Sequence, residues 1–403
     1  MGNTSTLLTP DLVAKVRDML EKAGERIPPW RASPEEISRF RAQVAGILVR
    51  LDGVPDALVP DLAAEVVSWI CGLGPLQSLV DEDGIEEVIV RKGFVYVERF
   101  GKIEAIGWMG PDELFREIAT RAADLGGRAI WGSKPYVLVD LPEGHRFSAM
   151  VPPLSIEGTA INIRVFRKGM SIGELWRLGT FSPQEAEEES DEEILDLLRD
   201  EGVEPKPFLV EVAKAIRRNA ASILISGPFS AGKTTLLNAL LGLIPKTHVV
   251  AIVETFRELQ PPEHLHPLRA VVPEVLERRG GLPPMREIID VLYKRMRPDW
   301  IVFGEIVGEE AIPLLDAMNL GKRVMTTIHG EDPYTALLHL EMLALASGLP
   351  LPAIRERVAR GVNLILHMDR AGRKRFLREV VKVEGYDYDR GQYILRKIYD
   401  GRK

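Results

Sequence analysis

The chain has 403 residues, of which 45% are hydrophobic and 28% are charged, the composition of a folded protein with two or three domains. Its net charge of −7 shows no basic excess, so nucleic acid is not favoured as its main partner. The single cysteine, Cys71, excludes an internal disulfide framework and a multi-cysteine zinc site. The sequence contains no apolar run of about 18 residues and no signal peptide, and we therefore expect a cytoplasmic protein.

The first 70 residues predict a helical module. Helix starts are indicated near Thr9, Ser33 and Pro60, and apolar residues follow each of them at helical spacing. The surface of this module indicates no chemistry, so structural packing and the docking of a partner both remain open.

Residues 71–168 predict an α+β domain. β-branched and aromatic runs indicate strands at 85–90, 94–99, 136–141, 145–150 and 160–166, and an amphipathic pattern indicates a helix over 112–125. Arg146 follows a hairpin turn, and Arg164 lies in an otherwise apolar strand. A strand arginine often belongs to a solvated face or an ion pair, so the pattern alone leaves both roles open.

Residues 169–207 predict a linker. The run 185–193 is almost purely acidic, which favours a solvated or mobile segment, and residues 194–198 indicate a short helix after it.

The stretch 222–241 predicts a nucleotide site. An apolar strand pattern leads into Gly227, then Gly232, Lys233 and Thr234, and a leucine-rich helical pattern follows. This is the G-x-x-x-x-G-K-T signature of a P-loop between a strand and a helix. Glycines let the backbone wrap around phosphate oxygens, and the N–H groups at the helix start point at the anion. We expect Lys233 to reach the β- and γ-phosphates of ATP and Thr234 to bind Mg²⁺.

Alternating strand and helix patterns over 208–403 predict a mainly parallel sheet with helices on both faces. Strands over 249–253, 300–303 and 324–328 end at Glu254, Glu305 and His329. Ligands of open α/β sheets bind beyond the carboxyl ends of the strands, so these residues are expected beside the P-loop. Any one of these residues alone is compatible with an ordinary surface position, but three of them at strand ends beside a P-loop favour a catalytic role. Further helices are indicated at 334–345 and 351–362, and further strands at 364–368, 376–383 and 393–398.

Four segments together resemble the secretion-superfamily ATPases, the motors of type II and type IV secretion, type IV pili and archaeal flagella. They are the P-loop and the segments 297–305, 317–321 and 326–330. The upstream segments 74–90, 95–99, 151–153 and 163–166 resemble the Tad/Flp pilus branch. The resemblance implies an α/β protein with a RecA-like P-loop domain at 208–403, an α+β N-domain at 71–168, a helical module at 1–70 and a linker with an acidic insertion at 169–207.

The resemblance also implies roles for individual residues. Glu305 matches the Walker B acid and would bind Mg²⁺ together with Thr234, while Glu254 matches the glutamate of the acidic box. One of the two glutamates would orient the attacking water. His329 matches the histidine box near the γ-phosphate. Arg146 and Arg164 match N-domain arginines that neutralise phosphate charge, and Arg269 is a further candidate for that role. Nucleotide-binding positions are Gly227, Ser230, Ala231, Gly232, Lys233, Thr234 and Thr235.

The sequence departs from the family pattern at three sites. Thr255 stands where the acidic box normally has aspartate, Val307 stands where the Walker B segment normally has arginine, and Gly330-Glu331 replaces the usual Ala-Asn. These changes keep a nucleotide-switched scaffold with little or no turnover open as an alternative. A conjugation-type DNA-transfer motor is a second alternative, which the lack of a basic excess disfavours.

The resemblance implies an ATP-hydrolysing motor that powers assembly of a Tad/Flp-like type IV pilus or secretion of macromolecules across the inner membrane. The expected cofactors are ATP and Mg²⁺. The partners that the resemblance implies are further copies in a homohexamer and inner-membrane platform proteins, with only peripheral membrane contact through those partners.

Overall fold

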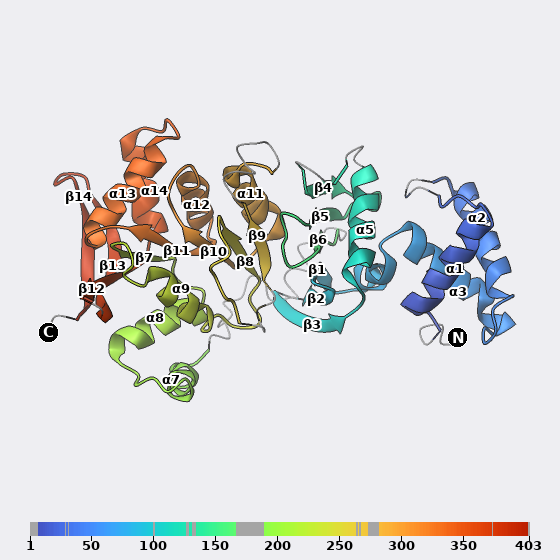
Figure 1. The fold of residues 1–403 in the computed structure, drawn as a ribbon, viewed down its shortest axis with the longest axis horizontal. Helices are drawn as coiled ribbons and strands as arrows, with labels where there is room; N and C mark the ends of the chain where they lie inside the picture. The colour runs from blue at the N-terminus through green and yellow to red at the C-terminus, as the bar shows by residue number, and fades with distance from the viewer. Residues whose placement is uncertain are drawn as a thin grey trace, which may run out of the picture. The chain divides into compact units, whose positions relative to one another are not determined.

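The computed structural model describes residues 7–28, 30, 32–99, 101–125, 129–130, 134–166, 189–262, 265, 267–272, 282–372 and 374–401. The chain divides into two compact units, Met1–Arg167 and Lys168–Lys403 (Figure 1). The first unit contains two hydrophobic cores, one in its helices and one under its sheet, and the second unit has cores of its own.

The first unit begins with a helical module, as the sequence predicts. Helices α1 (Pro10–Lys22), α2 (Pro34–Leu48) and α3 (Val59–Cys71) surround one core, and η2 (Asp56–Leu58) leads into α3. The Thr9 hydroxyl accepts a hydrogen bond from the Leu12 N–H, and Ser33 and Glu36 form a reciprocal capping box at α2. Each helix therefore begins where its local sequence satisfies the first free N–H groups.

The α+β part of this unit is an antiparallel sheet covered by one helix. After η3 (Gly74–Leu76) and α4 (Gln77–Asp81), the strands are β1 (Ile85–Arg91), β2 (Phe94–Arg99), β3 (Lys102–Trp108), β4 (Tyr136–Asp140), β5 (Arg146–Met150) and β6 (Ala160–Arg164), in the order β3-β2-β1-β6-β5-β4. Helix α5 (Asp112–Leu125) buries Phe115 and Ile118 against the sheet. Strand β3 was not predicted, because it is mostly exposed and its apolar residues do not alternate with a buried face.

The second unit contains an eight-stranded sheet in the order β14-β13-β12-β7-β11-β10-β8-β9. Neighbouring strands from β12 to β9 pair in parallel, and β13 and β14 extend that sheet antiparallel. The strands are β7 (Ile223–Gly227), β8 (Val250–Glu254), β9 (Leu268–Val271), β10 (Trp300–Glu305), β11 (Arg323–His329), β12 (Leu364–Ala371), β13 (Lys374–Asp387) and β14 (Gln392–Asp400). Strand β9 was not predicted from the sequence, because its four residues are too few to show a strand pattern.

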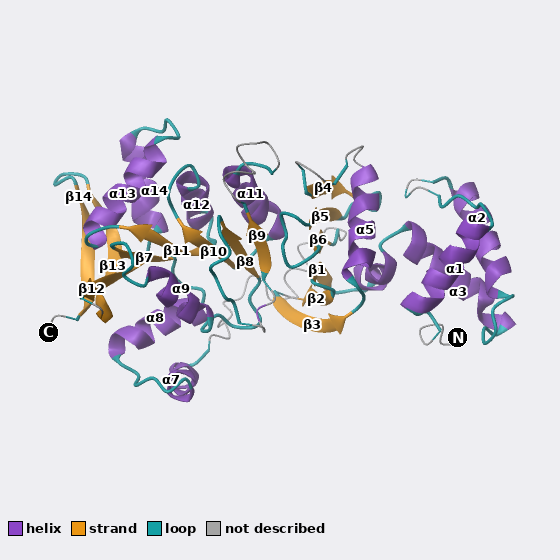
Figure 2. Ribbon diagram, viewed as in Figure 1, coloured by secondary structure: helices purple, strands orange, loops and turns teal. Residues whose placement is uncertain are grey.

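Helices cover both faces of this sheet, as Figure 2 shows. Helices α8 (Pro207–Arg217) and α9 (Lys233–Leu241) lie on one side, and α12 (Ala311–Asn319), α13 (Pro333–Leu345) and α14 (Leu351–Gly361) lie on the other (Figure 1). Helix α11 (Met285–Val291) continues into a short π-helix, η5 (Leu292–Met296). The apolar strands β7, β10 and β11 form the centre of the core between these layers.

Part of the predicted linker is folded. Helix α7 (Asp191–Asp200) starts with a capping box between Ser190 and Glu193, and its Ile194 and Leu198 pack against α8. Acidic side chains in a first helical turn interact favourably with the helix dipole, so this end of the acidic run promotes a helix. Residues 185–188 of that run lie outside the described residues.

Among the described residues, no single helix is long and apolar enough to cross a membrane, and the one helix pair that passes by length and composition is bent by 116°.

Candidate nucleotide site

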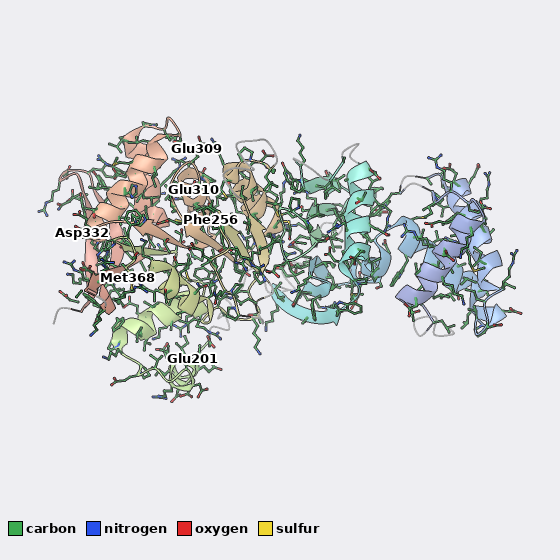
Figure 3. The ribbon with its side chains drawn as sticks, viewed as in Figure 1. Glu201, Phe256, Glu309, Glu310, Asp332 and Met368 are labelled. Atoms are coloured by element: carbon green, nitrogen blue, oxygen red, sulfur yellow. The ribbon has the colours of Figure 1, made fainter. Side chains whose placement is uncertain are left out.

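The loop after β7 needs glycine at two positions. Gly227 has a φ of 152°, and a Cβ atom there would lie 2.4 Å from the carbonyl oxygen of Met368, a residue labelled in Figure 3. Gly232 has a φ of 92° and is the N-cap of α9. Larger residues adopt these conformations only with strain, so the P-loop glycines are required by the backbone itself.

The start of α9 is suited to an anion. Gly232 offers no side chain to cap the helix, and the N–H groups of the first turn therefore remain available. Thr234 is half-buried in this turn and Thr235 is exposed. The helix is held from behind by Leu237 and Leu241, which are fully buried. A fixed helix N-terminus with free N–H groups and a threonine hydroxyl fits triphosphate and Mg²⁺.

Lys233 points back into its own loop. Its side chain is 7% exposed, and Nζ donates to the carbonyl oxygens of Gly227 at 3.2 Å and Pro228 at 3.3 Å. Nζ also lies 3.0 Å from Nδ1 of His329 and 4.0 Å from Oε1 of Glu305. Burial lowers the pKa of Lys233, and the Glu305 carboxylate acts in the opposite direction. The lysine thus fills the space where phosphate oxygens are expected.

His329 joins the lysine to the glutamate. Its Nε2 lies 2.8 Å from Oε1 of Glu305, and its Nδ1 faces the Lys233 ammonium. An ammonium group can only donate, so Nδ1 is the acceptor and the neutral ring carries its proton on Nε2. The parallel pairing of β11 with β7 places His329 beside Gly227, which explains why residues so distant in sequence meet.

Phe229 is a part of the site that the sequence did not single out. Its ring lies against that of His329 in a tilted arrangement, with ring centroids 3.7 Å apart and an angle of 35° between the planes. Burial first, and then the charge of Lys233, lowers the pKa of His329, while Glu305 raises it. The only available signal was an aromatic residue inside a P-loop, a position that the motif leaves open.

Glu305 is the more accessible of the two candidate glutamates. Its side chain is 38% exposed, and the β10–β11 register shifts between Phe303 and Glu305. A local irregularity of this kind re-aims a side chain at the end of a strand. The Thr327 hydroxyl holds this end by donating to the Gly304 carbonyl oxygen at 2.8 Å. Glu305 therefore has one oxygen bound by His329 and faces solvent.

Glu254, the other candidate glutamate, is deeply buried. Its side chain is 1% exposed and pairs with Arg269, whose side chain is 3% exposed, over 2.7 Å. Its other oxygen accepts hydrogen bonds from the N–H groups of Glu258 and Leu259. Arg269 is thus engaged inside the domain, where the sequence had suggested a phosphate contact.

The two candidate arginines of the first unit, Arg146 and Arg164, occupy paired positions on neighbouring strands. Arg146 on β5 is directly opposite Arg164 on β6, and both are exposed. Their outer neighbours across the strands are Asp140 on β4 and Glu87 on β1. Neither arginine forms an ion pair with a residue that the structure describes. Like charges directly opposite on neighbouring strands repel, so a bound anion would stabilise this pair.

The departures from the family pattern lie at the same sheet edge. Val307 is 57% exposed, and its N–H donates to Glu310, which the sequence did not single out. Glu310, labelled in Figure 3, also accepts from the Gly308 N–H at 2.8 Å. A buried carboxylate therefore shapes the turn after β10 in place of a longer polar side chain at position 307.

Comparisons with known proteins identify relatives of this chain. TrbB, a conjugal transfer protein of Rhizobium radiobacter, is 30% identical over 319 residues, covering 77% of this chain and 86% of TrbB. PtlH, a type IV secretion system protein of Bordetella pertussis, is 28% identical over 336 residues, covering 80% of this chain and 96% of PtlH. The crystal structure of the VirB11 ATPase of the Brucella suis type IV secretion system, in complex with sulphate, has the same fold with a TM-score of 0.64 at 23% identity, covering 77% of this chain and 96% of VirB11. The family model for type II/IV secretion system proteins matches residues 71–384, and the chain belongs to that family.

Proposed function

We propose that this protein is an ATPase that drives a secretion or conjugation machine. The observation that carries the proposal is the contact of Lys233, His329 and Glu305, which three neighbouring elements bring together beside a P-loop. A donor for phosphate oxygens, a polar ring and an accessible carboxylate are the groups that phosphoryl transfer to water requires. The family membership and the conjugal transfer relative support the biological setting.

In the proposed reaction Lys233 exchanges its loop carbonyls for phosphate oxygens, and α9 presents its first N–H groups to the same anion. A water oxygen attacks the γ-phosphorus while the bond to the ADP oxygen breaks. Glu305 orients this water and takes its proton, and His329 holds the Glu305 carboxylate in place. Thr234 and Glu305 would hold Mg²⁺, which would supply positive charge at the transferring phosphate.

We extend the proposal to Arg146 and Arg164 as groups that neutralise phosphate charge. The pairing of their positions on neighbouring strands supports this, because two adjacent guanidinium groups make a strong phosphate receptor.

We further propose a homohexamer that acts with inner-membrane platform proteins. Light scattering with and without ATP tests this assembly, and a protein that stays a monomer with ATP would contradict it.

The decisive experiment is a phosphate-release assay on the full chain. We expect Lys233→Ala to lower kcat by about 100-fold or more, because it removes a preorganised charge at the transferring phosphate. Lys246→Ala, at an exposed lysine outside the P-loop, is the matched control and should keep wild-type turnover. Equal phosphate release by wild type and Lys233→Ala would refute the ATPase.

The same assay separates the branches of the family. A conjugation-type motor, which the TrbB relative favours, predicts faster ATP hydrolysis on adding DNA and a steep loss of this effect with salt. A Tad/Flp-like pilus motor, which the upstream segments favour, predicts no response to DNA. Tight nucleotide binding without turnover, even with partner proteins, would instead identify a nucleotide-switched scaffold, the alternative that Thr255 and Val307 suggest.

A further inference from the structure

The carboxylate of Glu254 has no oxygen left for a water molecule. Oε2 accepts from Nε of Arg269 at 2.8 Å and from its terminal nitrogen at 2.7 Å. Oε1 accepts from the N–H groups of Glu258 at 2.8 Å and Leu259 at 2.6 Å. A carboxylate has about four lone-pair positions, so four N–H donors saturate it.

Arg269 is equally committed to this arrangement. Its guanidinium donates to the Leu259 carbonyl oxygen at 2.6 Å in addition to Glu254. The parallel pairing of β8 with β9 places Arg269 next to Ile252, two residues before Glu254, so both partners project from rigid strands. Together they fix the backbone of the loop that follows β8 at two of its residues.

That loop is in turn attached to the helix of the P-loop. Asn238 on α9 accepts from the Gln260 N–H at 2.6 Å and donates to the Glu258 carbonyl oxygen at 3.4 Å. Glu258 is also one of the two residues whose N–H groups bind Glu254. A continuous chain of contacts therefore runs from the buried ion pair through the loop to α9, the helix that starts at Lys233.

We propose that Glu254 and Arg269 form a buried brace that positions α9 for nucleotide binding, and that Glu305 alone orients the attacking water. The second half of this inference rests on the proposed ATPase function. Arg269 is a positioning residue that acts through Glu254 and the 255–260 loop. Glu254 uses both of its oxygens to hold the loop and Arg269, whereas Glu305, with its side chain 38% exposed, has a free oxygen for water.

The test is a set of substitutions in the full chain, with three measurements. Arg269→Met leaves the Glu254 charge buried without its cation, so we expect Tm to fall by about 10 °C. The affinity for a fluorescent ATP analogue should fall by about 10-fold, because α9 loses its support. The double variant Glu254→Met/Arg269→Met removes both charges, so it should recover part of the Tm lost in Arg269→Met. It also removes the hydrogen bonds that hold the loop, so its nucleotide affinity should stay below that of wild type.

Measuring turnover distinguishes a bracing role of Glu254 from a role as catalytic base. Glu305→Gln should lower kcat by about 100-fold or more at unchanged Tm, the loss expected for a general base. At saturating nucleotide the Glu254→Met/Arg269→Met variant should lose far less of its kcat than Glu305→Gln does. Arg217→Met is the matched control. It breaks the partly buried ion pair between Arg217 and Glu189 in the same unit and should leave nucleotide affinity unchanged.

Two results would overturn the brace. The first is a double variant that has wild-type Tm and nucleotide affinity but has lost kcat as completely as Glu305→Gln, since Glu254 would then be the base. The second is an Arg269→Met variant with wild-type nucleotide affinity, since the position of α9 would then not depend on the pair. A wild-type protein that binds nucleotide without hydrolysing it would refute the ATPase proposal only, because Tm and affinity still decide whether the brace exists.

Discussion

His329 is the residue on which the site converges. Its ring contacts Lys233 in the P-loop, Glu305 at the end of β10 and the ring of Phe229. Its backbone carbonyl oxygen lies 3.0 Å from Nδ1 of His339 on α13. A ring that contacts three side chains, on a backbone that α13 also contacts, has one orientation, and this explains how a neutral histidine can fix the position of a carboxylate.

The titration of His329 should report this environment. Burial and the Lys233 charge, with a smaller contribution from His339, hold its pKa below the ordinary value of 6.5, against the opposing effects of Glu305 and the Gly227 backbone. We expect Lys233→Ala to raise the pKa of His329, measured from its ring signals by NMR. His367 is the internal control, because burial is the main cause of its lowered pKa and Lys233 is not among the causes. An unchanged His329 midpoint in Lys233→Ala would contradict the contact.

The sign of the stability effect follows from this depressed pKa. A histidine that binds its proton less readily in the folded state than in the unfolded state contributes stability that is fully present above pH 6.5. That stability is lost as the pH falls below 6.5 toward the folded-state pKa. The loss on acidification should therefore be smaller in Lys233→Ala than in wild type.

At the scale of single elements, the P-loop is determined by backbone geometry. Gly227 lies so close to the Met368 carbonyl oxygen that even a methyl group cannot be placed without moving β7 away from β12. The conformation of Gly232 then directs the chain into α9. The loop shape is thus fixed before any nucleotide binds.

We expect Gly227→Ala to destabilise the second unit by about 2 kcal/mol or more, because the added Cβ meets backbone and the φ of 152° is strained for alanine. Thermal unfolding measures this change. Gly242→Ala, at the end of the same helix, is the matched control, since its φ of −62° suits alanine and its nearest contact is 3.3 Å away. Equal losses in the two variants would show that the close approach to Met368 is unimportant.

Elements with local signals were predictable from the sequence. The helix over 112–125 agrees with α5 because its apolar spacing and acidic start lie within the segment itself. Strand β3 and the short strand β9 were missed because pairing with neighbours, and not their own residues, makes them strands. In the site, the strand-end positions of Glu305 and His329 followed from sheet geometry. The pairing of Glu254 with Arg269 depends on the register of β8 and β9, which the sequence does not reveal.

At the scale of the whole molecule, the chain consists of two compact units with separate cores. The P-loop, Glu305 and His329 belong to the second unit, and Arg146 and Arg164 belong to the first. Separate cores allow two unfolding transitions, and a ligand raises only the transition of a unit that binds it. Nucleotide binding can therefore be assigned to each unit by calorimetry.

We expect a non-hydrolysable ATP analogue, at about 100 times its Kd, to stabilise the second unit by about 2.7 kcal/mol. Gly227→Ala identifies the transition of this unit, and Lys233→Ala should abolish its shift. If the arginines bind phosphate as proposed, the transition of the first unit also rises in wild type. Arg146→Ala/Arg164→Ala should then remove that second shift and leave most of the first. If nucleotide leaves the unfolding temperature of the first unit unchanged in the wild-type protein, the arginine contact is refuted and the P-loop site is unaffected.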